Sequence, residues 1–174
     1  MKARLDAVGA ALAAGVAADA VNTAMLWGFD ALGVSTAHGG LLRLLLRSAD
    51  AVLATVGTGT LPPPTPAVQV AFHAAVGLAM ALGYAGLVEP RLPGPPWCRA
   101  LATALAAWLV NAALVLPATG EGFAGSRHLG SFGLAAFGLA HTAFFLVLAE
   151  SYARLGPAHR SREVMGPRRG GSTG

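Results

Sequence analysis

The stretch that decides the fold runs from Leu129 to Glu150 and reads LGSFGLAAFGLAHTAFFLVLAE. It carries no acidic or basic residue before Glu150 except for one histidine, His141, at its middle. At about 1.5 Å per residue, a helix of this length reaches roughly 33 Å, enough to cross a hydrocarbon core of about 30 Å. The stretch therefore predicts a transmembrane helix.

The composition of the whole chain also favours a membrane environment. Of its 174 residues, 55 % are hydrophobic and 11 % are charged, against about 25 % charged in an ordinary soluble domain. The net charge is +4, but Lys and Arg stand at the ends of apolar runs and not on one patch among aromatic residues. We therefore expect one helical membrane domain with lipids, and not nucleic acid, around it.

Four apolar runs are long enough to span a membrane, at about residues 7–29, 67–88, 97–117 and 129–150. We expect an all-α fold, a four-helix transmembrane bundle with one additional interfacial amphipathic helix between spans 1 and 2. This domain covers residues 1–155. Residues 156–174 are rich in Gly, Pro and Arg, and we expect a disordered, basic, cytoplasmic tail.

The first apolar run has two interpretations. Its basic start and its Ala-x-Ala pattern are also typical of a signal peptide, with cleavage near residues 18–20. Apolar residues continue through Trp27 and Phe29, beyond such a cleavage point. We therefore expect a retained helix.

The interfacial helix is predicted at about residues 40–58. At 100° per residue, Arg43, Arg47 and Asp50 fall on one narrow stripe among leucines and valines. Charges in a span are costly, so a helix lying in the membrane interface fits better. The two arginines either extend toward water or contact an anionic lipid or solute. The proline-rich residues 61–66 end the helix.

The Lys and Arg residues predict the orientation. Three lie on one side, namely Arg43, Arg47 and Arg127. Nine lie on the other, namely Lys2, Arg4, Arg91, Arg99, Arg154, Arg160, Arg162, Arg168 and Arg169. This distribution places both termini in the cytoplasm. The use of Arg over Lys, together with the Ala, Gly and Pro content, suggests a GC-rich bacterial genome, and hence the bacterial cytoplasmic (inner) membrane.

Each predicted span carries a polar residue between its centre and its outer half. These residues are Asp19, Asn22, His73, Asn111 and His141. An unpaired Asp near a helix centre costs about 2.5–3.5 kcal/mol, so a partner is expected. We hypothesise that the five side chains form one intramembrane polar cluster. It could set helix packing through hydrogen bonds, bind a small ligand, or relay protons.

Cofactor and catalytic signals are few. His73 and His141 are the minimum for a bis-His haem b or a metal, an alternative to the expectation of no cofactor. Cys98 is the only cysteine, so an internal disulfide is excluded. Residues 120–125, GEGFAG, match a nucleotide-binding glycine pattern, but they follow a membrane helix and not a strand, which predicts a loop. We assign no catalytic residues and do not expect an enzyme.

Small residues spaced by four predict close helix packing, or a homodimer. They are Gly9, Ala13 and Ala17 in the first span and Gly77, Ala81 and Ala85 in the second.

From His73 onward the chain resembles the small four-span bacterial inner-membrane proteins of the YagU-like type. The resemblance rests on FHAAVGLAMALGYAGL, ALAAWLVNAALVLPATGEGFAG and GLAHTAFFLVLAE. In such proteins a His often opens the second span and another lies in the fourth, matching His73 and His141 here. The resemblance implies a four-span fold and an inner-membrane location, and no activity.

Two functions remain from the sequence. The first is a non-enzymatic accessory or assembly subunit of a homo-oligomer or larger membrane complex. The second is a small-solute or proton-linked transporter or channel. A cavity from the outer face to the polar residues would favour the second, and a tight bundle with an apolar side face the first.

Overall fold

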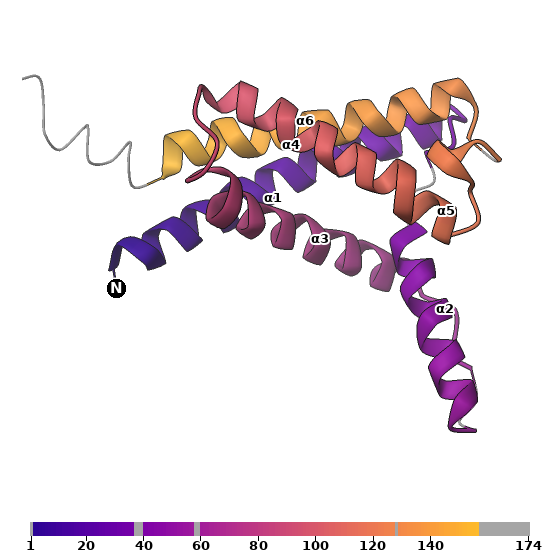
Figure 1. The fold of residues 1–174 in the computed structure, drawn as a ribbon. Coiled ribbons are helices and arrows are strands. Elements are labelled where there is room, and N and C mark those ends of the chain that lie inside the picture. The colour runs from indigo at the N-terminus through magenta and orange to yellow at the C-terminus, as the bar shows by residue number, and fades with distance from the viewer. Residues whose placement is uncertain (1, 37–39, 58–59, 128, 157–174) are drawn as a thin grey trace, which may run out of the picture.

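The computed structural model describes residues 2–36, 40–57, 60–127 and 129–156 (Figure 1). Every regular element in these ranges is helical. The α-helices are α1 (Lys2–Ala31), α2 (Gly40–Thr55), α3 (Pro66–Gly83), α4 (Pro96–Val110), α5 (Leu116–Ala118) and α6 (Ser131–Leu155). Two π-helical turns, η1 (Tyr84–Val88) and η2 (Asn111–Val115), continue α3 and α4, and a 3₁₀ turn, η3 (Phe123–Gly125), precedes α6.

The predicted fold class is confirmed. Four helical segments are long and apolar enough to cross a membrane, namely Lys2–Ala31, Pro66–Val88, Pro96–Ala118 and Ser131–Leu155. They correspond to the four predicted spans, although the first begins earlier than predicted, and the fourth helix ends at Leu155, where the predicted membrane domain ends. The fold is therefore that of a multi-pass membrane protein. The predicted tail lies outside the described residues from residue 157 onward.

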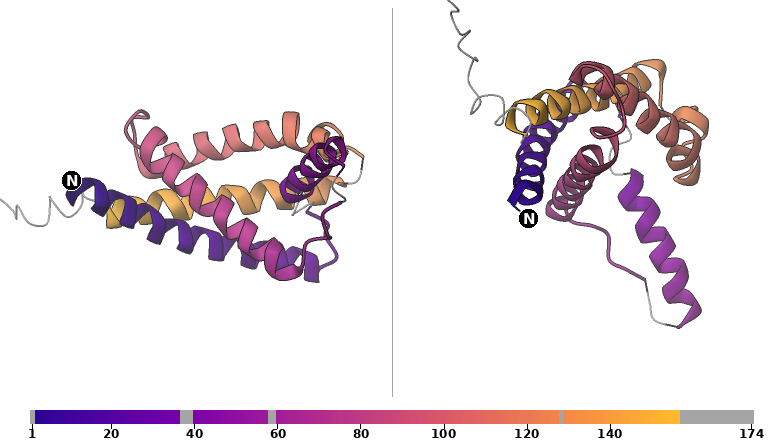
Figure 2. Two further views of the ribbon diagram at one scale, coloured as in Figure 1. Left: turned by 90° about the horizontal axis from the view of Figure 1, so that it is seen from below. Right: turned by 60° about the vertical axis from the view of Figure 1, so that its left-hand side comes forward.

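The four spans alternate in direction. The start of α1, the η1–α4 connection and the end of α6 lie together at one end of the bundle, the termini end (Figures 1 and 2). At the opposite end, the α2 end, lie α2, α5 and the loop that leads into α6. α2 runs across the direction of the spans and projects from the bundle, as an interfacial helix would (Figure 1).

The spans form an arc and not a closed four-helix square. α1 packs against both α3 and α6, and α6 packs against α4. α4 meets the α3 segment mainly at η1, near the termini end, so the arc stays open between α3 and α4 further along (Figure 2).

The core of the bundle lies toward the termini end. It consists of alanines and aromatic or leucine side chains: Ala10, Ala11, Ala14, Ala18, Ala81, Tyr84, Ala100, Ala104, Phe144, Phe145, Leu148, Ala149 and Tyr152. Alanines let the helix backbones approach closely, and the larger rings fill the space that remains.

Small residues spaced by four were predicted to mark the packing faces of the first two spans. The prediction is confirmed for α3 and wrong for the face by which α1 packs. Gly77 and Ala81 are buried against α1 as predicted. Gly9, Ala13 and Ala17, however, are exposed, and a Cβ at Gly9 would meet nothing within 4 Å. α1 packs through a neighbouring face that includes Gly15, where a Cβ would approach Cβ of Ala81 to 2.7 Å. A spacing of four occurs on several faces of an alanine-rich helix, so spacing alone does not choose the face.

Local sequence explains where the helices begin and end. α1 is closed by Gly33 with φ +74°, and the N–H of Val34 donates to the carbonyl oxygen of Phe29, the pattern of a Schellman motif. Thr65 caps α3 by accepting from the N–H of Val68, and Pro66 stands in the first helical turn. Residues 32–33 form the turn after α1.

Candidate functional site

Three of the five predicted polar residues lie in direct contact. Nε2 of His73, on α3, donates a hydrogen bond to Oδ1 of Asn22 on α1, at 3.1 Å. The same Nε2 lies 3.5 Å from Oδ1 of Asp19, one turn earlier on α1. Asn22 is buried, and the side chains of His73 and Asp19 are 35 % and 15 % exposed. Asp19 thus has the histidine partner that its depth required.

A glycine makes this approach possible. A Cβ at Gly77, one turn after His73, would lie 2.5 Å from Oδ1 of Asp19. Only a residue without a side chain leaves room there for the carboxylate between α1 and α3. The sequence therefore builds the contact by pairing a glycine with an acidic residue on the facing helix.

Asn111 and His141 are not bonded to this group. Nδ2 of Asn111 donates to the carbonyl oxygen of Ala107, at 3.0 Å, on its own helix. Nδ1 of His141 donates to the carbonyl oxygen of Phe137, at 2.9 Å, and the two rings lie 4.1 Å apart between centroids. Asn111 also begins the π turn η2, in which the N–H of Leu116 donates to the carbonyl oxygen of Asn111, five residues earlier. The joint role of the five residues stays a prediction.

Four of the five do share a cavity. A cavity of about 360 Å³ lies within the arc and is lined by α1, α3, α6, η2, the first residue of α5 and the first turn of α2. Its polar lining residues are Asn22, Thr23, Gln69, His73, Asn111 and His141. The remaining lining is apolar, including Leu26, Trp27, Leu42, Phe72, Val76, Met80, Val115, Phe137 and Phe144. Asp19 lies behind His73 and does not line it. We call this cavity the groove.

The groove lies in the half of the bundle toward the α2 end. Its lining begins at Leu41 and Pro66, beside α2, and extends to Met80 and Phe144. Beyond these two residues, the alanine and aromatic core fills the interior of the bundle. The groove is therefore closed toward the termini end.

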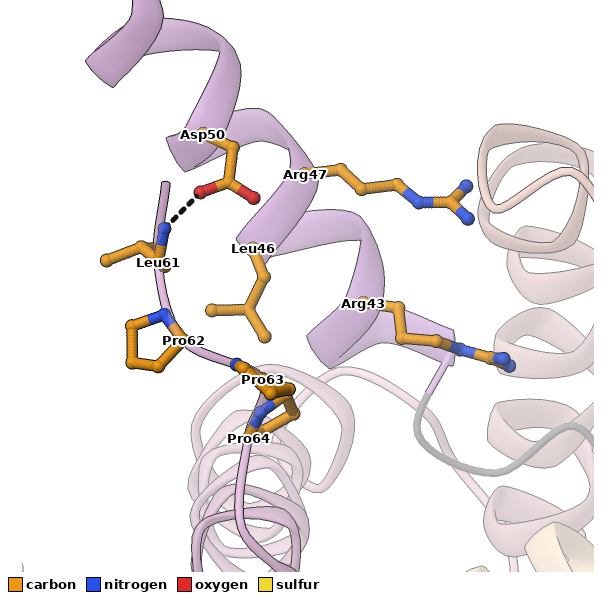
Figure 3. A pocket seen from close by; sticks show the side chains of 8 residues that line it. All are labelled: Arg43, Leu46, Arg47, Asp50, Leu61, Pro62, Pro63 and Pro64. Atoms are coloured by element: carbon orange, nitrogen blue, oxygen red, sulfur yellow. Dashed lines mark hydrogen bonds between the residues drawn. The ribbon is translucent and has the colours of Figure 1, made fainter. Parts of the chain in front are cut away.

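The charges of α2 are bonded within the chain. Nη1 of Arg47 donates to the carbonyl oxygen of Thr119, at 3.3 Å, and Nη2 of Arg43 lies 3.7 Å from Oε1 of Glu121. Oδ1 of Asp50 accepts from the N–H of Leu61, at 2.7 Å. In Figure 3 both arginines extend away from the proline segment, whereas Asp50 turns toward it. These contacts attach α2 to the loop that follows α5 and to the segment between α2 and α3.

A small pocket of about 180 Å³ separates α2 from the proline segment (Figure 3). Arg43, Arg47 and Asp50 all border it. Contact of the two arginines with an anionic lipid or solute stays a prediction, and any such anion would compete with Glu121 for Arg43.

Sequence reasoning missed a second polar group, at the termini end. Nη1 of Arg99 lies 2.9 Å from Oε1 of Glu89, with side chains 13 % and 26 % exposed. Tyr84, in η1, is 1 % exposed and stacks edge-on against Tyr152, with centroids 6.3 Å apart. The sequence indicates only an orientation role for Arg99. An acidic residue ten positions before an arginine, across a short proline-rich loop, was the signal available.

Metal and haem binding have a limited basis in the described residues. Among them, no three His, Cys, Asp or Glu side chains are grouped so as to hold a metal ion. Nδ1 of His141 donates to a backbone carbonyl oxygen, as in most metal-ligating histidines. Nε2 of His73, however, is hydrogen-bonded to Asn22. Haem or metal ligation stays a prediction.

The glycine-rich residues 120–125 form a loop. Gly120, Gly122 and Gly125 have positive φ, and the 3₁₀ turn η3 follows within it. This is the loop that the sequence predicted.

No protein-family model, curated protein or solved structure matches this chain. The resemblance to the YagU-like proteins therefore stays a prediction, and the site must be interpreted from its own chemistry.

Proposed function

We propose that this protein is a binding protein of the bacterial cytoplasmic membrane, with both termini cytoplasmic, that holds a small apolar molecule with a polar end in the groove. This function is non-enzymatic, in agreement with the lack of a catalytic motif in the sequence. The α2 end then faces outward, and the four-span arrangement agrees with the YagU-like resemblance. The orientation is supported by the nine basic residues on the side of the termini.

The observation that carries the proposal is the cavity itself. Its volume of about 360 Å³ lies in the range of small-molecule sites, roughly 300–1,000 Å³. It combines apolar walls with a few polar side chains, which is the usual composition of such sites. A tight bundle, as expected of an accessory subunit that acts only through packing, would have no such space.

The closed end of the groove favours binding over conduction. A channel needs a polar path along the whole bundle, and a core of alanines and rings occupies the half toward the termini end. Transport through this protein would need Met80 and Phe144 to separate from that core. Binding at the groove needs no such change.

Mass spectrometry of molecules that co-purify with the protein tests the proposal. The protein is extracted from membranes in a mild detergent, and the bound small molecules are compared with those of the bulk membrane. We expect one apolar species to be enriched in the wild type and to be lost in Val76→Trp, which fills the groove. Val68→Trp is the matched control, because Val68 is exposed on the same helix and does not line the groove. A bound fraction identical to the bulk membrane would overturn the proposal.

The orientation needs a separate test. A C-terminal fusion to green fluorescent protein should fluoresce, and one to alkaline phosphatase should be inactive, because the first requires the cytoplasm and the second the periplasm. The opposite pair of results would place the termini outside.

A further inference from the structure

The hydrogen bonds within the groove leave a specific set of polar atoms free for a ligand. Since the carbonyl oxygen of Phe137 can only accept, Nδ1 of His141 carries the hydrogen, and Nε2 of the neutral ring is an acceptor. Asn111 uses one amide hydrogen on Ala107 and retains the other. Oδ1 of Asn22 accepts from His73, which leaves its amide hydrogens. The groove therefore offers one strong acceptor and several amide donors.

The charge of the groove excludes an anionic or cationic head group inside it. Among the described residues, no Lys, Arg, Asp or Glu lines the groove. The nearby carboxylate of Asp19 already faces His73, and the arginines of α2 are bonded to Glu121 and to Thr119. An ion placed in the groove would lose its hydration without gaining a partner of opposite charge. The polar end of the ligand must therefore be neutral.

The walls favour a flat ring. Four aromatic side chains line the groove, on α1, α3 and α6: Trp27, Phe72, Phe137 and Phe144. Rings stack favourably on such side chains, in offset or edge-on arrangements. α3 packs on α1 and α4 packs on α6, with few contacts between α3 and α4, so a chain bound in the groove can continue into lipid on that side.

Resting on the proposed function, we propose that the groove binds a neutral lipid-soluble quinol, a dihydroxy ring with an apolar tail. One hydroxyl donates to Nε2 of His141. The other oxygen accepts from the amide hydrogens of Asn22 or Asn111. This assigns His141 as the residue that distinguishes a quinol from the corresponding quinone, because a quinone has no hydroxyl hydrogen to donate.

The three tryptophans provide the assay. Trp27, 63 % exposed, lines the groove, whereas Trp97, 52 % exposed, lies at the termini end and does not line it. The double variant Trp97→Phe/Trp108→Phe retains Trp27 alone, and Trp27→Phe/Trp108→Phe retains Trp97 alone. Each is placed in quinone-free phosphatidylcholine nanodiscs and titrated without oxygen, with decylubiquinol or with decylubiquinone. The Trp97 reporter measures partition of the probe into lipid.

We expect saturable quenching of Trp27 by decylubiquinol and a linear, non-saturating response at Trp97. Loss of one hydrogen bond, worth about 1.4 kcal/mol, corresponds to about tenfold in affinity. Decylubiquinone should therefore bind the Trp27 reporter about tenfold more weakly. His141→Leu should weaken quinol binding by the same factor and abolish the difference between the two probes. Thr142→Val, beside His141 but outside the groove lining, should change neither.

Equal affinities for quinol and quinone in the wild-type groove would overturn the assignment, and this comparison needs no substitution at His141. Linear quenching of Trp27 by both probes, together with a different co-purifying molecule lost in Val76→Trp, would overturn the quinol and leave the binding function standing. Linear quenching with no co-purifying molecule would overturn both.

Discussion

The two halves of the transmembrane bundle solve the same packing problem in different ways. Toward the termini end, alanines bring the helices together and large side chains such as Tyr84 and Leu148 fill the centre. Toward the α2 end, the same four spans diverge around a cavity of about 360 Å³ with polar side chains on its walls. Close packing in the tight half fixes the positions of the helices, and the cavity in the open half has room for a small molecule.

Each half also has its own polar contact between helices. The tight half has the charged pair of Glu89 and Arg99, which joins the ends of two consecutive spans. The open half has the hydrogen bond between Asn22 and His73, with the carboxylate of Asp19 3.5 Å from the same ring nitrogen. The comparison shows that the polar side chains join two helices at the termini end, whereas at the α2 end they also line a cavity. Substitutions should therefore affect stability in the tight half and binding in the open half.

The largest loss of stability is expected for Arg99→Met. It leaves the carboxylate of Glu89 partly buried without its partner, and breaking a buried ion pair costs about 3 kcal/mol or more. Unfolding in detergent, followed by circular dichroism, measures the change. The control is Arg91→Met in the same loop, because Arg91 is exposed and donates to the backbone carbonyl oxygens of Gly86 and Leu87. Equal losses in the two variants would contradict a special role for the pair.

A smaller loss is expected for Gly15→Val in the tight half. Even a Cβ at this position would lie 2.7 Å from Cβ of Ala81, so α1 and α3 must separate, at a cost of about 2 kcal/mol. Gly9→Val, two turns earlier on the same helix, adds the same atoms where nothing lies within 4 Å. The free energy of unfolding of the two variants should therefore differ by about this amount. No difference would show that the α1–α3 contact is not tight.

The sequence sufficed for the elements of this fold. The apolar runs gave the four spans and the stripe of Arg43, Arg47 and Asp50 gave α2, because length and periodicity are properties of one helix at a time. The end of α2 was placed three residues too late, since proline marks where a helix cannot continue and not where it stops.

The arrangement of the site could be predicted only in part. The depths of the polar residues predicted a partner for Asp19 within one cluster, and His73 lies beside it. Which helices are neighbours is not encoded in any single span, so the open side of the arc and the groove could not be predicted. Nor could the π turn at Asn111, because one extra residue per turn leaves no mark in an alanine-rich sequence.

The polar contact of the open half should contribute modestly to stability. Asn22→Leu removes the acceptor for Nε2 of His73 at nearly the same volume. Hydrogen bonds between membrane helices are worth about 0.6 kcal/mol on average and up to about 1.7, so we expect a loss in this range, smaller than for Gly15→Val. Thermal unfolding of the two variants in one detergent gives the comparison. A loss as large as that of Arg99→Met would mean that the open half also holds the bundle together.

The smallest change in stability is expected for an enlarged side chain in the open half, and it contrasts with the same kind of enlargement in the tight half. Val76→Phe adds a ring to the wall of the groove, where space exists, so the free energy of unfolding should change by less than about 0.5 kcal/mol. The same type of enlargement in the tight half, Ala104→Phe, places a ring at a position that is 5 % exposed and should cost about 1–3 kcal/mol. Unfolding curves for the pair measure this contrast. If Val76→Phe were as damaging as Ala104→Phe, the groove would have no usable space, and the distinction between a packed half and a binding half would fail.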